Sequence, residues 1–107
     1  MVDWYILDDH GNPVPERDLS RWGAWFESAP NRVLERDHLP GDVLVSTVFL
    51  GIDHNFSDRG SPLLWETMIL GGPHNGYCQR YASRKAALAG HQTGVEIARG
   101  KPMSFMT

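Results

Sequence analysis

Residues 42–52, DVLVSTVFLGI, form a long apolar run that is rich in β-branched side chains. Val, Ile and Thr favour strands because their branched side chains pack well on a pleated surface. The run is apolar on both faces apart from Ser46 and Thr47, and this pattern predicts a central strand of a sheet. It has about half of the ~20 residues that a membrane-spanning helix needs, so it does not predict a membrane segment.

Further strands are predicted on both sides of this run. Residues 63–70, LLWETMIL, are apolar except for Glu66 and Thr67 and predict a second buried strand. Residues 32–39 alternate between two faces, with Glu35 and Asp37 on the same one, which is typical of a strand with a solvated side. The Pro40-Gly41 turn signal joins that strand to the central one. Residues 4–7 predict a first short strand, and residues 77–81 predict an edge strand.

Two helices are predicted from capping residues and apolar stripes. Asp18 can cap a helix over residues 19–28, and Ser83 can cap one from residue 84 to about 99. The stripe of the first helix is Leu19, Trp22, Gly23 and Phe26, and that of the second is Ala87, Leu88, His91, Val95 and Ala98.

The order of these elements predicts an α+β fold. Short connections between successive strands favour an antiparallel β-meander of about four strands, with two helices packed on one face. Residues 1–100 are expected to form a single domain, and residues 101–107 a C-terminal tail that is mobile unless Phe105 docks.

Composition limits the classes of function. The single cysteine excludes an intrachain disulfide and suits the cytoplasm, and the N-terminus lacks the pattern of a signal peptide. A formal net charge of −3 argues against a broad nucleic-acid footprint, which needs clustered positive charge. The chain has no Walker sequence and no GxGxxG motif, so no cofactor is expected.

The sharpest candidate for chemistry combines four residues that are distant in sequence: Asp53, His54, Glu66 and His91. A buried carboxylate and a buried imidazole are costly unless they are paired. If the last helix packs across the sheet, Glu66 and His91 can meet, with His54 nearby. Two histidines and a carboxylate can bind a divalent metal or act as acid and base.

Each of these residues also has a structural explanation. His91 can be a core histidine bonded to a backbone carbonyl, and Glu66 can face solvent or pair with Arg36 or Arg80. Asp53 and His54 can satisfy backbone amides as the chain leaves the strand, in an Asx-type turn. The spacing matches no established metal or catalytic signature.

Three other features suggest binding. The loop between the two apolar runs is longer than hairpin closure needs, which leaves room for recognition. Its candidate partner-binding residues, with one aromatic from the first helix, are Asp53, His54, Asn55, Phe56, Asp58, Arg59 and Trp25. A candidate anion site comprises Arg80, Arg84 and Lys85, although three solvated side chains are the simpler explanation. Ala86, Gly90 and Gly94 predict close backbone approach, within the fold or across a homodimer.

Several sequence segments resemble those of a group of small phage and prophage proteins that has no assigned activity. They are VSTVFLGIDHNF (45–56), LLWETMILGG (63–72), RYASRKAALAGH (80–91), ILDDHGNPVP (6–15) and RWGAWFE (21–27). The chain departs from that group at Trp65, where Phe is expected, and in the basic segment ASRKAA, where a more acidic helix start is expected.

The resemblance and the absence of catalytic motifs lead to a first hypothesis. We expect a phage-encoded accessory protein of the host cytoplasm that binds a host or defence protein as an inhibitor or modulator, with no membrane partner. The first alternative is a metal-dependent or acid/base enzyme that uses His54, Glu66 and His91. The second is a nucleotide or nucleic-acid binder that uses the basic residues at the start of the last helix.

Overall fold

The computed structural model describes residues 3–57 and 59–100. Its elements, in chain order, are β1 (Tyr5–Leu7), β2 (Pro13–Pro15), α1 (Leu19–Ser28), η1 (Pro30–Arg32), β3 (Val33–Leu39), β4 (Val43–Phe49), β5 (Trp65–Leu70), β6 (Cys78–Tyr81) and α2 (Arg84–Ala98). The proposed tail with Phe105, and the candidate residue Asp58, lie outside the described residues.

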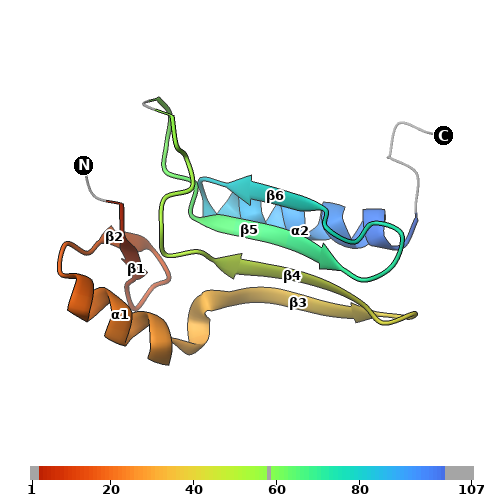
Figure 1. Cartoon of the computed structure of the whole chain (residues 1–107), viewed down its shortest axis with the longest axis horizontal. Coiled ribbons are helices and arrows are strands. Elements are labelled where there is room, and N and C mark those ends of the chain that lie inside the picture. Colours follow the sequence, from red (N-terminus) through yellow and green to blue (C-terminus); the bar gives the residue numbers. More distant parts are fainter. Residues whose placement is uncertain (1–2, 58, 101–107) are drawn as a thin grey trace.

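The last four strands form an antiparallel meander in the order β3-β4-β5-β6 (Figure 1). Thr47 of β4 lies directly opposite Thr67 of β5, and Glu66 lies opposite Arg80 of β6. The turn between β3 and β4 has positive φ at Gly41 (85°) and at Asp42 (59°), a conformation that costs glycine least. The predicted meander and its α+β class are therefore confirmed.

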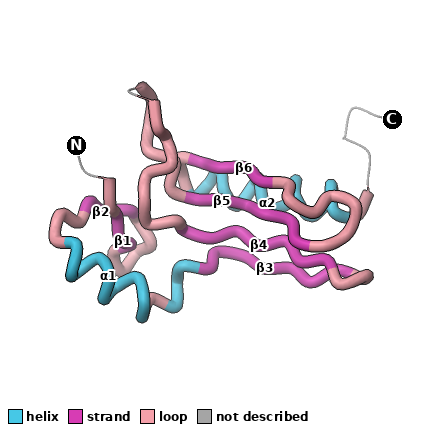
Figure 2. The backbone as a smooth tube through the Cα atoms, in the orientation of Figure 1, coloured by secondary structure: helices cyan, strands magenta, loops and turns pink. Residues whose placement is uncertain are grey.

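A strict alternation of burial shows which face of the sheet is covered. In β4 the buried residues are Val43, Val45, Thr47 and Phe49, and in β5 they are Trp65, Thr67 and Ile69. These side chains point toward α2, which lies across one face of the sheet (Figures 1 and 2). Glu66 and Ser46 occupy the intervening positions and therefore point to the opposite, uncovered face.

A small hairpin and α1 complete the fold at one end of the sheet. β1 pairs with β2, whose two prolines are tolerated because this strand has only one paired neighbour. Asp18 caps α1 by accepting bonds from the amides of Ser20 and Arg21, as predicted. The predicted stripe of α1 is only partly correct, because Leu19 is 55% exposed.

The aromatic residues of α1 join it to the rest of the domain. The indole nitrogen of Trp22 donates to the carbonyl oxygens of Tyr5 (3.1 Å) and Gly51 (3.0 Å). Trp25 packs edge-on against Phe49, with ring centroids 5.9 Å apart. Trp25 is therefore half-buried at the margin of the core.

The predicted alternation of β3 fails at one residue. The pairing register with β4 shifts between Val33 and Glu35, and this irregularity lets Leu34 pack against the core cluster of Phe49 and Trp65. After the shift the alternation holds, so the side chains of Asp37 and Leu39 point to the side of the sheet that α2 covers.

Small residues allow α2 to approach the sheet closely. A Cβ on Gly90 would overlap the ring and hydroxyl of Tyr81, and one on Gly94 would lie 3.0 Å from a methyl group of Thr67. The close approach predicted from Gly90 and Gly94 is thus made within the fold. Each glycine costs about 1 kcal/mol of helix propensity relative to Ala, which this packing offsets.

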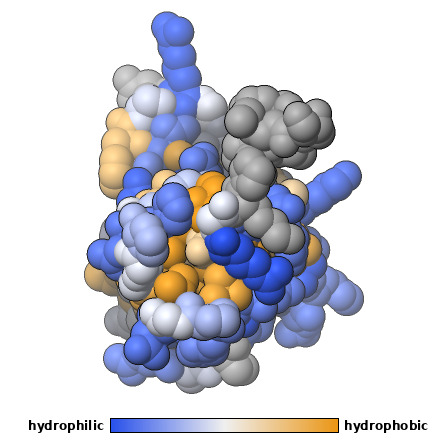
Figure 3. Space-filling view, turned by 90° about the vertical axis from the view of Figure 1, so that its right-hand side faces the viewer, coloured by the Kyte–Doolittle hydropathy of each residue, from blue (hydrophilic) through white to orange (hydrophobic). Residues whose placement is uncertain are grey.

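Hydrophobic side chains also gather at the end of the domain where the β3–β4 turn lies. Figure 3 views this end and shows apolar atoms near its centre, with hydrophilic groups around them. The core cluster of Val43, Val45, Ile69 and Val95 is flanked by half-buried Leu39, Tyr77, Ile97 and Ala98.

Across residues 3–57 and 59–100, the helices are too short and too polar for any of them to cross a bilayer.

Candidate functional site

The imidazole of His91 is completely buried between α2 and the sheet. Its Nδ1 lies 2.6 Å from the hydroxyl oxygen of Thr47, which in turn lies 2.5 Å from the hydroxyl oxygen of Thr67. Its Nε2 lies 2.7 Å from Oδ2 of Asp37 on β3. Both ring nitrogens therefore have partners, and the buried imidazole is fully satisfied.

The sequence predicted the inward orientation of His91 but not its partners. They are side chains rather than the expected backbone carbonyl, and Asp37 rather than Glu66 is the carboxylate. A signal for them exists in the sequence: Glu35 and Asp37 share one face of β3, and the threonines sit at inward positions of β4 and β5.

The Thr47 hydroxyl, the His91 imidazole and the Asp37 carboxylate are arranged like a catalytic nucleophile, its general base and the group that orients the base. Accessibility excludes that chemistry, because Thr47 and Thr67 are both 0% exposed and no substrate can reach either oxygen. The network instead fixes the position of α2 on the sheet. Only its Asp37 end opens to solvent, with 46% of that side chain exposed.

Glu66 and His91 lie on opposite faces of the sheet and do not meet. Glu66 accepts a hydrogen bond from Nε of Arg80 at 3.0 Å and one from the thiol of Cys78 at 3.2 Å. The pairing with Arg80 is one of the two structural explanations considered from the sequence. Burial raises the pKa of the Cys78 thiol, and its hydrogen bond to Glu66 raises that pKa further.

His54 lies in neither of these clusters. Its Nδ1 is 2.8 Å from the carbonyl oxygen of Ile52, and its ring lies against that of Phe56. The enzyme that would combine His54, Glu66 and His91 therefore lacks a common site.

The basic residues at the start of α2 are also dispersed. Arg80 is held by Glu66 on the uncovered face of the sheet, whereas Arg84 lines a hollow of about 280 Å³ with Asp9 and His10. Lys85 is exposed on the helix. The structure does not unite these three side chains into one anion site.

The connector, defined here as residues 50–64 between β4 and β5, rises away from the end of the sheet (Figures 1 and 2). Asp53 anchors its base: one carboxylate oxygen accepts from the amides of Asn55 (2.7 Å) and Leu63 (3.0 Å). This is the Asx-type turn considered from the sequence. The amide of His54 donates to the carbonyl of Leu63, which closes the base of the connector.

Asn55 holds the outer part of the connector together. Its Nδ2 donates to the carbonyl oxygens of Arg59 (2.7 Å) and Ser61 (3.0 Å). Its Oδ1 accepts from the amide and the hydroxyl of Ser57. These bonds order the backbone around Phe56 without burying that side chain, which is 85% exposed.

A shallow hollow of about 390 Å³ lies beside Phe56. Its lining residues are Asp3, Trp4, Ile52, Asp53, Asn55, Phe56 and Ser57. Two of its lining residues, Trp4 and Ile52, are joined by an antiparallel bridge, and Ile52 is 36% exposed. The hollow thus combines apolar side chains with two carboxylates.

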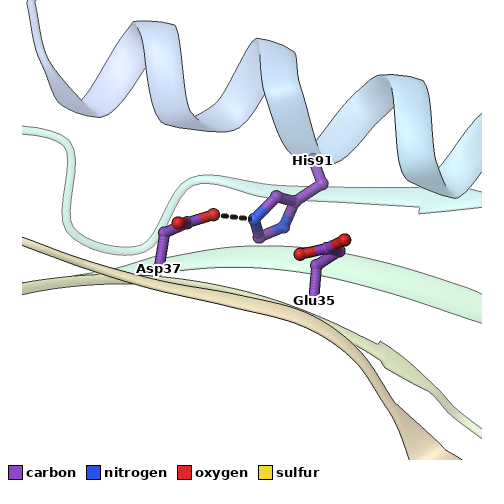
Figure 4. Close-up of side chains that lie close together, drawn as sticks. All are labelled: Glu35, Asp37 and His91. Carbon is purple, nitrogen blue, oxygen red and sulfur yellow. Dashed lines mark hydrogen bonds and ion pairs between the residues drawn. The ribbon is translucent and has the colours of Figure 1, made fainter.

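Among the described residues, one group is suited to holding a metal ion. One ligand atom from each of Glu35, Asp37 and His91 lies within 4.8 Å of the others (Figure 4).

A comparison with protein-family models found no match, and neither did searches of curated proteins and of solved structures.

Proposed function

We propose that this chain acts by binding another protein through the connector and the hollow beside it. The observation that carries the proposal is the state of Phe56, which is 85% exposed on a loop ordered by the hydrogen bonds of Asn55. Aromatic side chains provide much of the binding energy at protein interfaces when a partner buries them.

Order in the connector supports this function. A loop that is already held in one conformation loses less entropy on association than a flexible one. The side-chain hydrogen bonds of Asp53 maintain that conformation at the base of the connector, and those of Asn55 maintain it in the outer part. Phe56 is therefore presented in an arrangement that a partner can recognise directly.

The surroundings of Phe56 indicate the chemistry of the partner. Trp4 and Ile52 offer apolar contact area, while Asp3 and Asp53 place carboxylates at the hollow. The complementary surface is a protein with an apolar pocket for Phe56 and a Lys or Arg side chain for the hollow.

The resemblance to small phage and prophage proteins supports a more specific form of the proposal. The partner is then a protein of the infected host cell, including a component of its defence, and binding occurs in the host cytoplasm. Inhibition or redirection of that component would be the biological effect.

Affinity capture with matched variants tests the proposal. The wild-type chain, Phe56→Ala and the control Leu19→Ala are used to retain proteins from host lysate, because Leu19 is exposed on α1. We expect a protein that wild type and L19A retain and F56A loses. Equal retention by all three chains would place the binding surface elsewhere.

A further inference from the structure

We infer that Glu35, Asp37 and His91 form a binding site for a divalent first-row transition metal, with Zn²⁺ as the reference ion. This site is separate from the connector and from the proposed binding of a partner. Its ligand atoms come from two elements, β3 and α2, and lie within 4.8 Å of one another.

The fold brings these three groups together at the β3 edge of the sheet. Glu35 and Asp37 are two residues apart on a strand, so both side chains point to the side that α2 covers. His91 points down from the helix toward both carboxylates (Figure 4). The packing of the domain therefore brings the three groups close together, and small side-chain shifts would place each ligand atom at the ~2.0–2.2 Å that Zn²⁺ requires.

The second nitrogen of His91 is supported in the way that metal-binding histidines require. Such a histidine usually donates its other ring N–H to an oxygen atom, which fixes the tautomer and orients the ring. Nδ1 of His91 lies 2.6 Å from the hydroxyl oxygen of Thr47, which can accept that proton. Nε2 then presents its lone pair toward Asp37, 2.7 Å away, within the group that also includes Glu35.

The hydroxyl groups behind His91 can adopt either direction of hydrogen bonding. When Nε2–H donates to Asp37, Thr67 can donate to Thr47, and Thr47 to Nδ1. When Nδ1–H donates to Thr47, the Thr47 hydroxyl can donate to Thr67 instead. The nearby hydroxyl group of Tyr81 is buried and has no hydrogen-bond partner among the described residues.

A metal ion can therefore take the place of the hydrogen bond between Nε2 and Asp37 while Nδ1 keeps Thr47 as its partner. In the metal-free protein a proton joins Nε2 to Asp37 across 2.7 Å. With Nδ1 protonated, an ion bound to Nε2, Asp37 and Glu35 would occupy the space between those groups. The neutral imidazole carries one proton in both arrangements, so metal binding changes the tautomer of the ring and releases no proton from it.

The donor set selects the class of metal. One imidazole nitrogen with two carboxylates suits Zn²⁺ and its neighbours, whereas Ca²⁺ and Mg²⁺ prefer oxygen donors alone. Glu35 is exposed and 46% of the Asp37 side chain is exposed, so the ion can enter from solvent and keep water in its remaining positions. Such open positions distinguish a reactive or exchangeable site from a closed structural one.

Titration of metal-free protein with Zn²⁺ tests the inference. We expect one ion per chain by calorimetry, and a change of the His91 Nε2 chemical shift in ¹⁵N NMR spectra. Glu35→Gln removes one ligand at an exposed position and should weaken binding of Zn²⁺ by at least the ~10-fold that loss of an outer-shell partner costs. Glu96→Gln, an exposed carboxylate change on α2 itself, should leave the affinity unchanged.

Two results would overturn the inference. One is the absence of saturable binding of one Zn²⁺ per chain. The other is binding that Glu35→Gln leaves unaltered while the His91 signal does not move, because the ion would then occupy another histidine. Circular dichroism of each variant confirms that it is folded, and neither result depends on Phe56 or on capture of a partner.

Discussion

Nε2 of His91 and Oδ2 of Asp37 lie 2.7 Å apart although 54 positions separate these residues in the chain. The contact joins the last helix to the edge strand of the meander. Together with the bond to Thr47, it satisfies an imidazole that has no exposure to water. The stability of the α2–sheet contact should therefore depend on the hydroxyl groups beneath the ring.

Thr47→Val tests this dependence because valine has nearly the same shape as threonine. The substitution leaves Nδ1 of His91 buried without a partner and should lower the free energy of unfolding by about 1–3 kcal/mol. Urea denaturation measures the change. Ser46→Ala, the adjacent residue on the uncovered face, should change stability by less than about 0.5 kcal/mol; equal effects of the two substitutions would contradict the role of the network.

Two Gly→Ala substitutions in helices should change the free energy of unfolding in opposite directions. A Cβ at Gly90 would overlap Tyr81, so Gly90→Ala should destabilise the protein by about 1–3 kcal/mol. Gly23 in α1 has no atom near its Cβ position, so Gly23→Ala should stabilise it by about 0.4–1 kcal/mol. Thermal or urea unfolding of both variants checks the prediction, and a stabilising Gly90→Ala would show that α2 does not approach the sheet so closely.

Cys78 should react slowly with iodoacetamide at pH 8. Burial and the hydrogen bond to Glu66 raise the pKa of its thiol, against the opposing effect of Arg80, so less of the reactive thiolate is present at a given pH. Glu66→Gln removes the negative charge, lowers that pKa and should speed alkylation several-fold. Glu35→Gln, on the other face, is the matched control; a rate unaffected by Glu66→Gln would refute the assigned cause.

The ordered connector should be cleaved slowly by trypsin, for which Arg59 is the cleavage site in this segment. Asn55→Ala removes the bonds to the carbonyls of Arg59 and Ser61, so cleavage at this site should become faster. Asn31→Ala, an exposed substitution in η1, should leave the rate unchanged. Mass spectrometry of the fragments identifies the site, and unchanged cleavage in Asn55→Ala would mean that the side chain does not order the loop.

Local patterns in the sequence were sufficient to predict most of the fold. The β-branched runs around Val45 and Ile69 indicated the central strands, and Asp18 and Ser83 cap their helices as predicted. The inward orientation of His91 followed from the stripe on its helix. These features depend on neighbours in the chain, which periodicity and capping describe well.

The partners of the candidate residues were harder to predict because they depend on strand register. Glu66 and Thr67 are adjacent, yet the pleat sends one to Arg80 on the uncovered face and the other to the core. Which of the two joins the hydrogen-bond network of His91 depends on a shift of the strand register by a single residue. The first strand, β1, was predicted, but its partner β2 was missed, because Pro13 and Pro15 argue against a strand unless it lies at an edge.

Site-specific photo-crosslinking in host cells provides the sharpest test of recognition through the connector. One variant carries a photoreactive residue in place of Phe56, and a second variant carries it in place of Leu70. Leu70 is 45% exposed on the uncovered face of the sheet. We predict a discrete adduct with another protein from position 56 and none from position 70. An adduct from position 70 alone would contradict the proposal and would assign recognition to the open face of the sheet.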